Sequence, residues 1–187
     1  MTSHSLTESM QRLVDKAEIR DAICRYARGV DRGDWDLVRS GYHPDAYDAH
    51  GDYKGDIDGF IAWLDERFAE VDNSMHFLGQ SLMEFAGPDL ALVETYFVSR
   101  RLRSPTAEEA RTLQPTDMIV REGWGRYVDR FERRDGAWRV AHRTVVLEAV
   151  SSSVGMGGKR ADGPICWSNR KGADRLNELH EEIFGEG

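Results

Sequence analysis

The apolar residues near the start of the chain recur with the period of a helix. They fall about every three or four positions, at Leu13, Ile19, Ile23, Tyr26 and Val30. Ser5 and Glu8 can form a capping box at the start of such a helix, and Gly33 can end it in a left-handed conformation. The pattern therefore predicts one long amphipathic helix between Ser5 and Gly33.

Two shorter helices are predicted next. Asp34 can cap a helix from Trp35 to Tyr42, which Pro44 would end. Asp56 can cap a third helix, whose apolar face would consist of Ile57, Phe60, Ile61, Leu64 and Phe68. A short strand from Ala46 to Lys54 is expected between these two helices.

The pattern then changes to that of strands. Two hairpins are predicted: residues 75–85 and 90–103 flank a turn at 86–89, and residues 117–133 and 137–150 flank a turn at 134–136. Asp135-Gly136 is the stronger turn signal, because Gly accepts the positive φ of a tight hairpin. Residues 104–116 contain two prolines and no clear period, which predicts a loop. The Ser- and Gly-rich residues 151–158 are expected to be flexible and to lead to a short helix over 172–184.

Helices followed by a run of antiparallel strands predict the α+β class. We expect a curved antiparallel sheet that wraps around the N-terminal helices as a cone, with a pocket for a small molecule at its open mouth. This domain would span residues 1–150. Residues 151–187 would form a flexible C-terminal extension with a short helix.

The composition narrows the possible partners and the compartment. The 187 residues are 40% hydrophobic and carry a net charge of −8, so we expect no nucleic-acid partner. No apolar run approaches the length of a membrane span, and the first residues lack a secretory apolar region. The two cysteines, Cys24 and Cys166, fit neither a disulfide framework nor a zinc motif. A soluble cytoplasmic protein is therefore expected.

Asp31 is an informative polar residue of the first predicted helix. It falls at the helix end near the face that carries Tyr26 and Val30, so its carboxylate is expected to point toward the core. The helix dipole disfavours a carboxylate at this end, so Asp31 requires a partner. The alternative is that Asp31 only caps the following turn.

His76 opens the first long strand and is a second candidate for chemistry. A neutral imidazole can take or give a proton near pH 7, and an adjacent carboxylate would fix its tautomer and raise its basicity. A single histidine in a strand is also often a purely structural hydrogen-bonding group. The sequence does not show whether His76 touches Asp31.

The segment from residue 43 to residue 50 is rich in His and Asp. Four residues there suggest metal ligands: His43, Asp45, Asp48 and His50. They lack the His-x-x-x-His spacing of a helical site and have no cysteine nearby, so no metal is expected. In an extended strand, Asp48 and His50 would share a face opposite Tyr47 and could both line the pocket. We also expect no cofactor, because no phosphate-binding or dinucleotide motif is present.

The later strands and the loop between the hairpins offer further pocket candidates. Tyr96 lies on one face of a predicted strand, and Arg111 lies in a loop from which it could cover the mouth. Alternation on the last strand would turn His142 inward, whereas a β-bulge would place Arg143 inside instead. The three arginines among residues 100–103 are expected to form a solvated edge or to bind an anionic group.

Several motifs along residues 10–150 match a known family in order and spacing. They are Tyr26-x-x-x-x-Asp31, the junction Tyr42-His43-Pro44-Asp45-Ala46, His76 at the head of the long strands, and the closing segment Asp135-Gly-x-Trp-Arg-Val-Ala-His-Arg143. These motifs resemble the SnoaL-like proteins of the nuclear-transport-factor-2-like superfamily, which have the cystatin-like cone fold. The resemblance implies a dyad of Asp31 and His76, with Tyr26 facing the pocket.

The segment from Tyr42 to Gly55 looks most like a subgroup of diarylpropane lyases. The resemblance implies an enzyme that needs no cofactor and releases formaldehyde from a lignin-derived diarylpropane diol to give a stilbene. It is the resemblance that suggests this substrate; the residues alone do not.

We therefore expect a cofactor-independent lyase that acts on a small hydroxylated aromatic molecule. His76, oriented by Asp31, would take a proton, and Tyr26 or His50 would protonate the departing hydroxyl. Arg143 or Arg111 would stabilise a developing oxyanion. The residues expected to contact the substrate are Tyr47, Asp48, Tyr96, Arg111, His142 and Arg143.

Two other functions and an assembly state follow from the same features. The alternatives are a dehydratase of a polycyclic or steroid-like alcohol, and a non-catalytic module for ligand binding or assembly. A homo-oligomer, dimer or trimer, is expected because the convex side of an open curved sheet usually needs to be covered.

Overall fold

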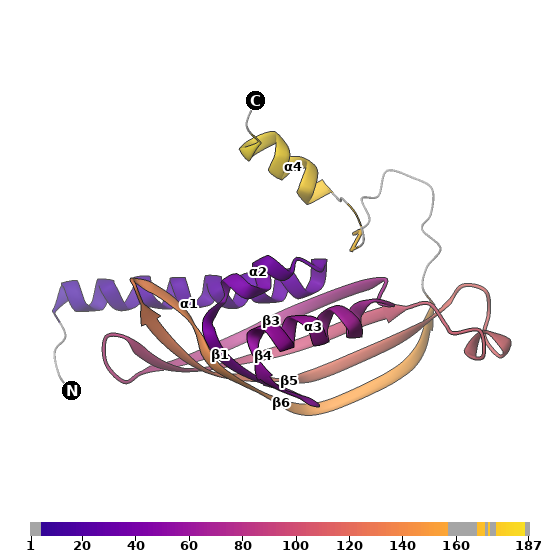
Figure 1. Cartoon of the computed structure of the whole chain (residues 1–187), viewed down its shortest axis with the longest axis horizontal. Coiled ribbons are helices and arrows are strands. Elements are labelled where there is room, and N and C mark those ends of the chain that lie inside the picture. The colour runs from indigo at the N-terminus through magenta and orange to yellow at the C-terminus, as the bar shows by residue number, and fades with distance from the viewer. Residues whose placement is uncertain (1–4, 157–167, 171, 173–174, 186–187) are drawn as a thin grey trace.

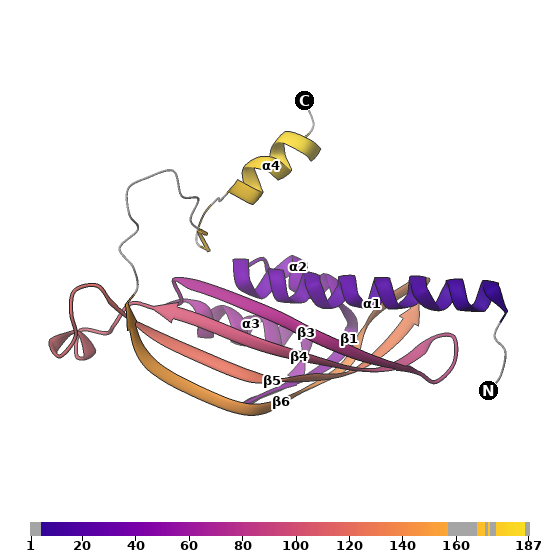
Figure 2. The same cartoon turned by 180° about the vertical axis from the view of Figure 1, so that it is seen from behind.

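A curved sheet holds three helices in its hollow. The computed structural model describes residues 5–156, 168–170, 172 and 175–185. Helices α1 (Leu6–Arg32), α2 (Trp35–Ser40) and α3 (Ile57–Phe68) lie along the concave side of a six-stranded sheet (Figures 1 and 2). This arrangement confirms the predicted α+β class. Among the described helices, none is long and apolar enough to cross a membrane.

Helix α1 begins and ends where the sequence predicts. The Ser5 hydroxyl accepts a hydrogen bond from the Glu8 backbone N–H at 3.2 Å, and the Glu8 carboxylate accepts one from Ser5 N–H at 2.8 Å. Gly33 ends the helix with a φ of 69°. The predicted apolar stripe is buried apart from Leu13, which is 68% exposed. Leu13 belongs to the N-terminal third of α1, and the N-terminal end of this helix extends past the turns of the long hairpins (Figure 1).

The chain enters the sheet earlier than predicted. Helix α2 ends at Ser40 instead of Tyr42, and β1 (Tyr42–His50) begins almost at once. Pro44 therefore lies within β1 and does not end a helix. The pairing of β1 with β6 is irregular between Tyr42 and Tyr47, which accommodates a residue that cannot donate a backbone hydrogen bond.

The predicted single strand from Ala46 to Lys54 is two strands. Strand β1 turns back into β2 (Tyr53–Asp56), and the two pair as a hairpin. Gly51 makes the turn possible because its φ of 67° lies in the left-handed region. Asp56 then caps α3 as predicted, by accepting a hydrogen bond from Gly59 N–H at 2.8 Å.

The long strands form both predicted hairpins. They are β3 (Asn73–Phe85), β4 (Leu90–Arg103), β5 (Asp117–Arg134) and β6 (Ala137–Met156). The strand order is β2-β1-β6-β5-β4-β3, and neighbours pair antiparallel except β1 and β6, which are parallel. The sheet is therefore mixed, where the sequence analysis expected an antiparallel one. Asp135 and Gly136 have φ of 53° and 79°, as the predicted tight turn requires.

The Ser- and Gly-rich segment after Val150 is ordered, contrary to expectation. Strand β6 continues to Met156, because residues 151–156 pair with residues 117–122 of β5. Backbone pairing holds this segment in the sheet although its side chains are small. Residues 157 and 158 lie outside the described residues. The predicted loop over 104–116 holds one short turn, η1 (Glu109–Arg111).

The predicted C-terminal helix is present as α4 (Arg175–Phe184). None of its residues is buried. The hydrophobic core lies instead between α1, α3 and the concave face of the sheet, around Ile23, Phe60, Phe131 and Trp138.

Candidate active site

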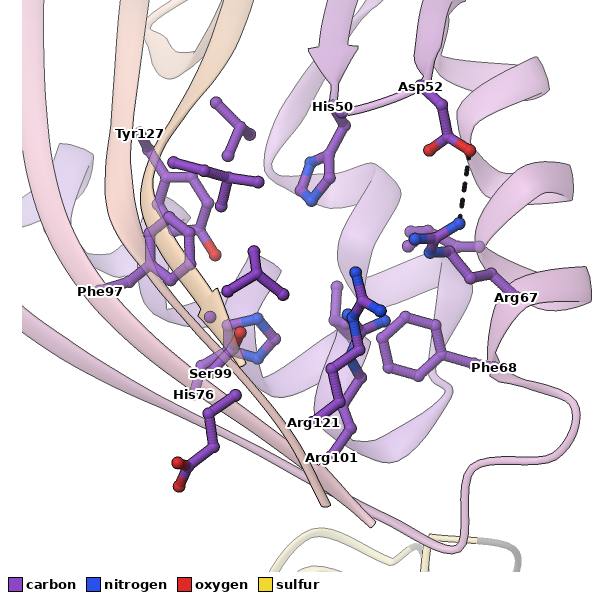
Figure 3. A pocket seen from close by; sticks show the side chains of 18 of the residues that line it. His50, Asp52, Arg67, Phe68, His76, Phe97, Ser99, Arg101, Arg121 and Tyr127 are labelled. Atoms are coloured by element: carbon purple, nitrogen blue, oxygen red, sulfur yellow. Dashed lines mark hydrogen bonds and ion pairs between the residues drawn. The ribbon is translucent and has the colours of Figure 1, made fainter. Parts of the chain in front are cut away.

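A pocket opens between the concave face of the sheet and helices α1 and α3. It holds about 700 Å³ of space, part of which is open solvent at its mouth. Tyr127 and Phe97 form one wall, with their rings stacked at 4.3 Å (Figure 3). Trp63 and Phe68 of α3 lie on another side. An aromatic molecule fits such a lining well.

Asp31 and His76 are in contact at this pocket. Asp31 sits in the last turn of α1 and is 8% exposed. Its Oδ1 lies 2.7 Å from Nδ1 of His76 and accepts a hydrogen bond from the Ser74 hydroxyl at 2.8 Å. Its Oδ2 accepts one from the His76 backbone N–H at 2.7 Å. The carboxylate thus has the partners that its unfavourable position at a helix end requires.

This geometry decides the state of Asp31 and the tautomer of a neutral His76. Burial would raise the pKa of the Asp31 carboxyl, but the hydrogen bonds and the charge of His76 outweigh it, so the pKa lies below its usual value. Asp31 is therefore an acceptor, and a neutral His76 carries its proton on Nδ1. The Nε2 atom of His76 is then the basic nitrogen, on a residue that lines the pocket.

His50 enters the same pocket from the end of β1 and has a looser carboxylate partner. Its Nδ1 lies 3.6 Å from Oδ1 of Asp48, which is fully buried. The other oxygen of Asp48 accepts a hydrogen bond from the Tyr42 hydroxyl at 2.7 Å. Among the described residues, neither Asp48 Oδ1 nor His50 Nδ1 has a hydrogen-bond partner. A proton on His50 Nδ1 would face this carboxylate.

Two tyrosines also line the pocket. Tyr26 is buried on α1, as expected, and meets Tyr127 edge-on with ring centroids 5.4 Å apart. Figure 3 shows the Tyr127 hydroxyl directed toward the interior. This hydroxyl is buried, and burial raises its pKa well above the usual value. Tyr127 therefore keeps its proton and can donate a hydrogen bond to a bound molecule.

Arg143 lies under the pocket and does not line it. A bulge at Ala141 shifts the alternation of β6, because Val140 pairs with Phe131 and His142 with Arg130. Arg143 is 0% exposed and forms two hydrogen bonds to Asp129, at 2.7 and 2.6 Å. Of the two alternatives for this strand, the bulged one is correct.

The guanidinium of Arg143 stabilises the aromatic floor of the pocket. It lies 4.2 Å from the ring centroids of both Tyr26 and Tyr127, and its Nη1 donates to the Tyr42 hydroxyl at 3.1 Å. Burial opposes the charge, but Asp129 outweighs it and holds the pKa of Arg143 above its usual value. Arg143 thus positions aromatic side chains and is screened from a bound molecule.

Four other residues expected to contact the substrate lie away from the pocket. Tyr47 and His142 are exposed and stack on each other, with ring centroids 5.0 Å apart. Tyr96 points outward and lies near Arg126, because the opposite face of β4 carries the pocket residues Phe97 and Ser99. The fourth is Arg111, which is exposed in η1 and absent from the pocket lining. Asp48 does not line the pocket, but it lies next to His50, which does.

Several pocket residues were missed by sequence reasoning. They are Arg67, Phe97, Ser99, Arg101, Arg121 and Tyr127. The alternation of β4 had two possible inward faces, and only long-range packing selects the one with Phe97 and Ser99. Arg101 belongs to the run that was expected either to be solvated or to bind an anion. Among the described residues, no group of three or more His, Cys, Asp or Glu is placed to hold a metal ion.

The sequence of the chain matches the model of one protein family. Residues 11–144 match the SnoaL-like domain. The chain belongs to the SnoaL-like family. A comparison with curated protein sequences gives no match.

Solved structures share the fold of this SnoaL-like protein. One is a candidate scytalone dehydratase from Novosphingobium aromaticivorans, with 14% identity, TM-score 0.65, and coverage of 76% of this chain and 90% of that one. Another is a hexachlorocyclohexane dehydrochlorinase from Novosphingobium barchaimii, with 18% identity, TM-score 0.64, and coverage of 78% and 94%. A third is a cystatin-like protein from Nostoc punctiforme, with 13% identity, TM-score 0.52, and coverage of 72% and 92%. At these identities the likeness concerns the fold.

Proposed function

We propose that this SnoaL-like protein is a cofactor-independent lyase that performs an acid–base elimination on a hydroxylated aromatic molecule. The observation that supports this most is the 2.7 Å contact between Asp31 and His76 at an aromatic pocket. Asp31 fixes the tautomer of His76, so that Nε2 is the basic nitrogen of a residue at the pocket wall. A base placed in this way is the first requirement of an elimination.

The second requirement is an acid for the departing hydroxyl. His50 is our candidate, because a proton on its Nδ1 faces the buried Asp48 carboxylate at 3.6 Å while the ring lines the pocket. The imidazolium then gives up a proton from Nε2 as the C–O bond breaks. The Tyr127 hydroxyl donates a hydrogen bond to the reacting oxygen and remains protonated. Of the two sequence-based candidates for the proton donor, Tyr26 and His50, this proposal chooses His50.

Our best substrate proposal is a lignin-derived diarylpropane diol. His76 takes the proton of the primary hydroxyl, and its carbon becomes formaldehyde as the adjacent C–C bond breaks. The electron pair of that bond forms the new double bond of the stilbene. The secondary hydroxyl leaves and takes a proton from His50, so the products are a stilbene, formaldehyde and water. One proton enters His76 and one leaves His50, so no oxidant is needed.

A simple dehydration is the second candidate. In that reaction His76 removes a proton from carbon, and His50 again protonates the hydroxyl that leaves as water. The fold similarity to a candidate scytalone dehydratase and to a dehydrochlorinase favours it, since both names denote eliminations. The same two histidines serve both reactions, and only the products separate them.

The test is a turnover assay with protein treated with EDTA. The diarylpropane diol is added, and stilbene absorbance and released formaldehyde are followed together. Stoichiometric stilbene and formaldehyde would support the deformylating lyase. An alkene without formaldehyde from a polycyclic alcohol would support the dehydratase. If folded protein turns over neither, a non-catalytic binding module becomes the better explanation, and Asp31–His76 is then a structural hydrogen bond.

A further inference from the structure

Three arginines from three different elements meet at the mouth of the pocket. They are Arg67 of α3, Arg101 of β4 and Arg121 of β5. Figure 3 shows Arg101 and Arg121 side by side next to Phe68. The same three residues also line an adjoining open hollow, so they lie between the aromatic interior and the solvent. This is an unusual concentration of positive charge in a chain with a net charge of −8.

The arrangement is unfavourable without a further partner. Arg101 and Arg121 are directly opposite each other in the β4–β5 pairing, where like charges repel. Burial, together with the charges of Arg121 and Arg67, lowers the pKa of Arg101 to about 10. The guanidinium of Arg101 lies 5.1 Å from the ring centroid of Phe68, and a ligand of opposite charge would relieve the remaining repulsion.

Carboxylates of the protein leave two of the three arginines unmatched. Nη1 of Arg67 lies 3.5 Å from Oδ2 of Asp52, whose side chain is exposed. Glu122, the other acidic residue of the pocket lining, lies 3.7 Å from Arg100. Within the described part of the chain, neither Arg101 nor Arg121 forms an ion pair with a carboxylate.

Arginines elsewhere in the sheet show the contrast. Arg103 next to the cluster pairs with Glu109 at 2.8 Å, and Arg126 pairs with Glu94 at 2.5 Å. The unmatched guanidiniums are therefore confined to the pocket side of this pair of strands. Guanidinium forks bind carboxylates with two parallel hydrogen bonds, more specifically than a lysine would.

We propose that Arg101 and Arg121, with Arg67 beside them, bind a carboxylate on the substrate, so that the natural substrate is a hydroxylated aromatic molecule that also carries an acid group. The acid group sits at the mouth, and the aromatic body lies inward against Phe97 and Tyr127. The reacting carbons are thereby held near His76. This inference names the substrate class of the proposed lyase, so it rests on the proposed function where it calls the bound acid a substrate. The anion site itself does not depend on that function.

Binding is tested without turnover, by isothermal titration calorimetry with biphenyl-4-carboxylate and with the neutral biphenyl-4-carboxamide. We expect the wild type to bind the carboxylate at least about 10-fold more tightly than the amide, as for charge-assisted hydrogen bonds. The double variant Arg101→Gln/Arg121→Gln should bind both alike. Arg101→Lys should retain part of the preference, because it keeps the charge and loses the fork.

The control variant is Arg130→Gln. It removes the same charge from β5 outside the pocket, where Arg130 pairs with Glu132, and it should leave both affinities unchanged. Equal binding of the two probes by the wild type, or an unchanged preference in the double variant with a normal melting curve, would overturn the proposal. A carboxylate preference without turnover of any aromatic alcohol would refute the lyase and keep the anion site. Turnover of an aromatic alcohol without a preference for the carboxylate probe would support the lyase and refute the anion site.

Discussion

At the scale of single residues, the contact between Asp31 and His76 is the feature on which activity should depend. A positioned acid or base contributes about 10²–10⁴-fold to a rate. We expect His76→Ala and Asp31→Asn to lower kcat by about that factor in the stilbene assay, with the far-UV circular dichroism spectrum unchanged. His142→Ala is the matched control, because this imidazole is exposed outside the pocket. Wild-type turnover in folded His76→Ala would exclude the proposed base.

The Asp31 carboxyl should also make the stability of the fold depend on pH. Its pKa in the folded chain lies below the ordinary 3.8, so the folded state binds fewer protons on Asp31 than the unfolded state near that pH. The resulting stabilisation is complete above 3.8 and is lost as the pH falls through the folded pKa. The difference in melting temperature between the wild type and Asp31→Asn should therefore be largest near neutral pH and shrink below 3.8. A difference that grows on acidification would contradict this assignment.

The sequence identifies Asp31 and His76 as candidates but does not show that they are in contact. The position of Asp31 at a helix end already indicates that it needs a partner. The partner, His76, lies 45 residues later in the chain. Whether the two side chains meet depends on how α1 lies across β3. The roles of Tyr127 and Arg101 were missed for a related reason. Each lies on a strand whose inward face is selected by packing, and periodicity alone allows either face.

At the scale of elements, the bulge in β6 creates a buried ion pair that should be costly to break. Replacing Arg143 leaves the fully buried Asp129 without its partner, which costs about 3–5 kcal/mol. We expect Arg143→Met to lower the urea midpoint accordingly. The double variant Asp129→Leu/Arg143→Met should recover much of this loss, since it removes both charges. Equal destabilisation of the single and double variants would show that aromatic contacts, and not the ion pair, dominate.

Arg170, which follows the last strand in the sequence, contacts the C-terminal end of α1. Arg170 donates a hydrogen bond to the Val30 carbonyl at 2.7 Å and lies 4.8 Å from the ring centroid of Phe68. A cation at a helix C-terminus and over an aromatic ring is favourable. Arg170→Ala should therefore lower the free energy of unfolding by about 1–2 kcal/mol. Arg170→Lys should restore part of it, and an unchanged unfolding curve for Arg170→Ala would refute the role.

At the scale of the whole molecule, the convex face of the sheet suggests self-association. Large apolar side chains are exposed on β3, β4 and β5: Met75, Phe77, Leu82, Leu92, Tyr96 and Trp124. Exposed apolar side chains in such number are typical of an interface. We expect light scattering to give a dimer or trimer, and Phe77→Glu to shift the mass toward one chain. A wild-type mass of 21.3 kDa would contradict the expectation.

Most of the architecture could be predicted because its signals are local. The capping box at Ser5, the cap at Asp56 and the turn at Gly136 each depend on a few neighbouring residues. Apart from the missed turn at Gly51, the errors concern pairings between distant segments. Strand β1 pairs parallel to β6, about 100 residues away, and this pairing draws Tyr42 and Pro44 into the sheet. Helical propensity at these positions is too weak to oppose the hydrogen bonds of the sheet.

The bulge at Ala141 also changes what a mutation in β6 means. Before it, the even-numbered Trp138 and Val140 point to the core; after it, the odd-numbered Arg143, Val145 and Leu147 lie on the pocket side. A substitution in β6 alters one side chain of this wall. Deletion of the bulged residue would leave the wall from 143 to 147 in place, because Val140, His142 and Arg143 would then follow one another in plain alternation opposite Phe131, Arg130 and Asp129. Straightening of the bulge at unchanged length would instead exchange this wall for the side chains that now face outward. Among related sequences, a gap of one residue here is therefore compatible with the same pocket lining, whereas a relative of equal length that lacks the bulge would have a differently lined pocket.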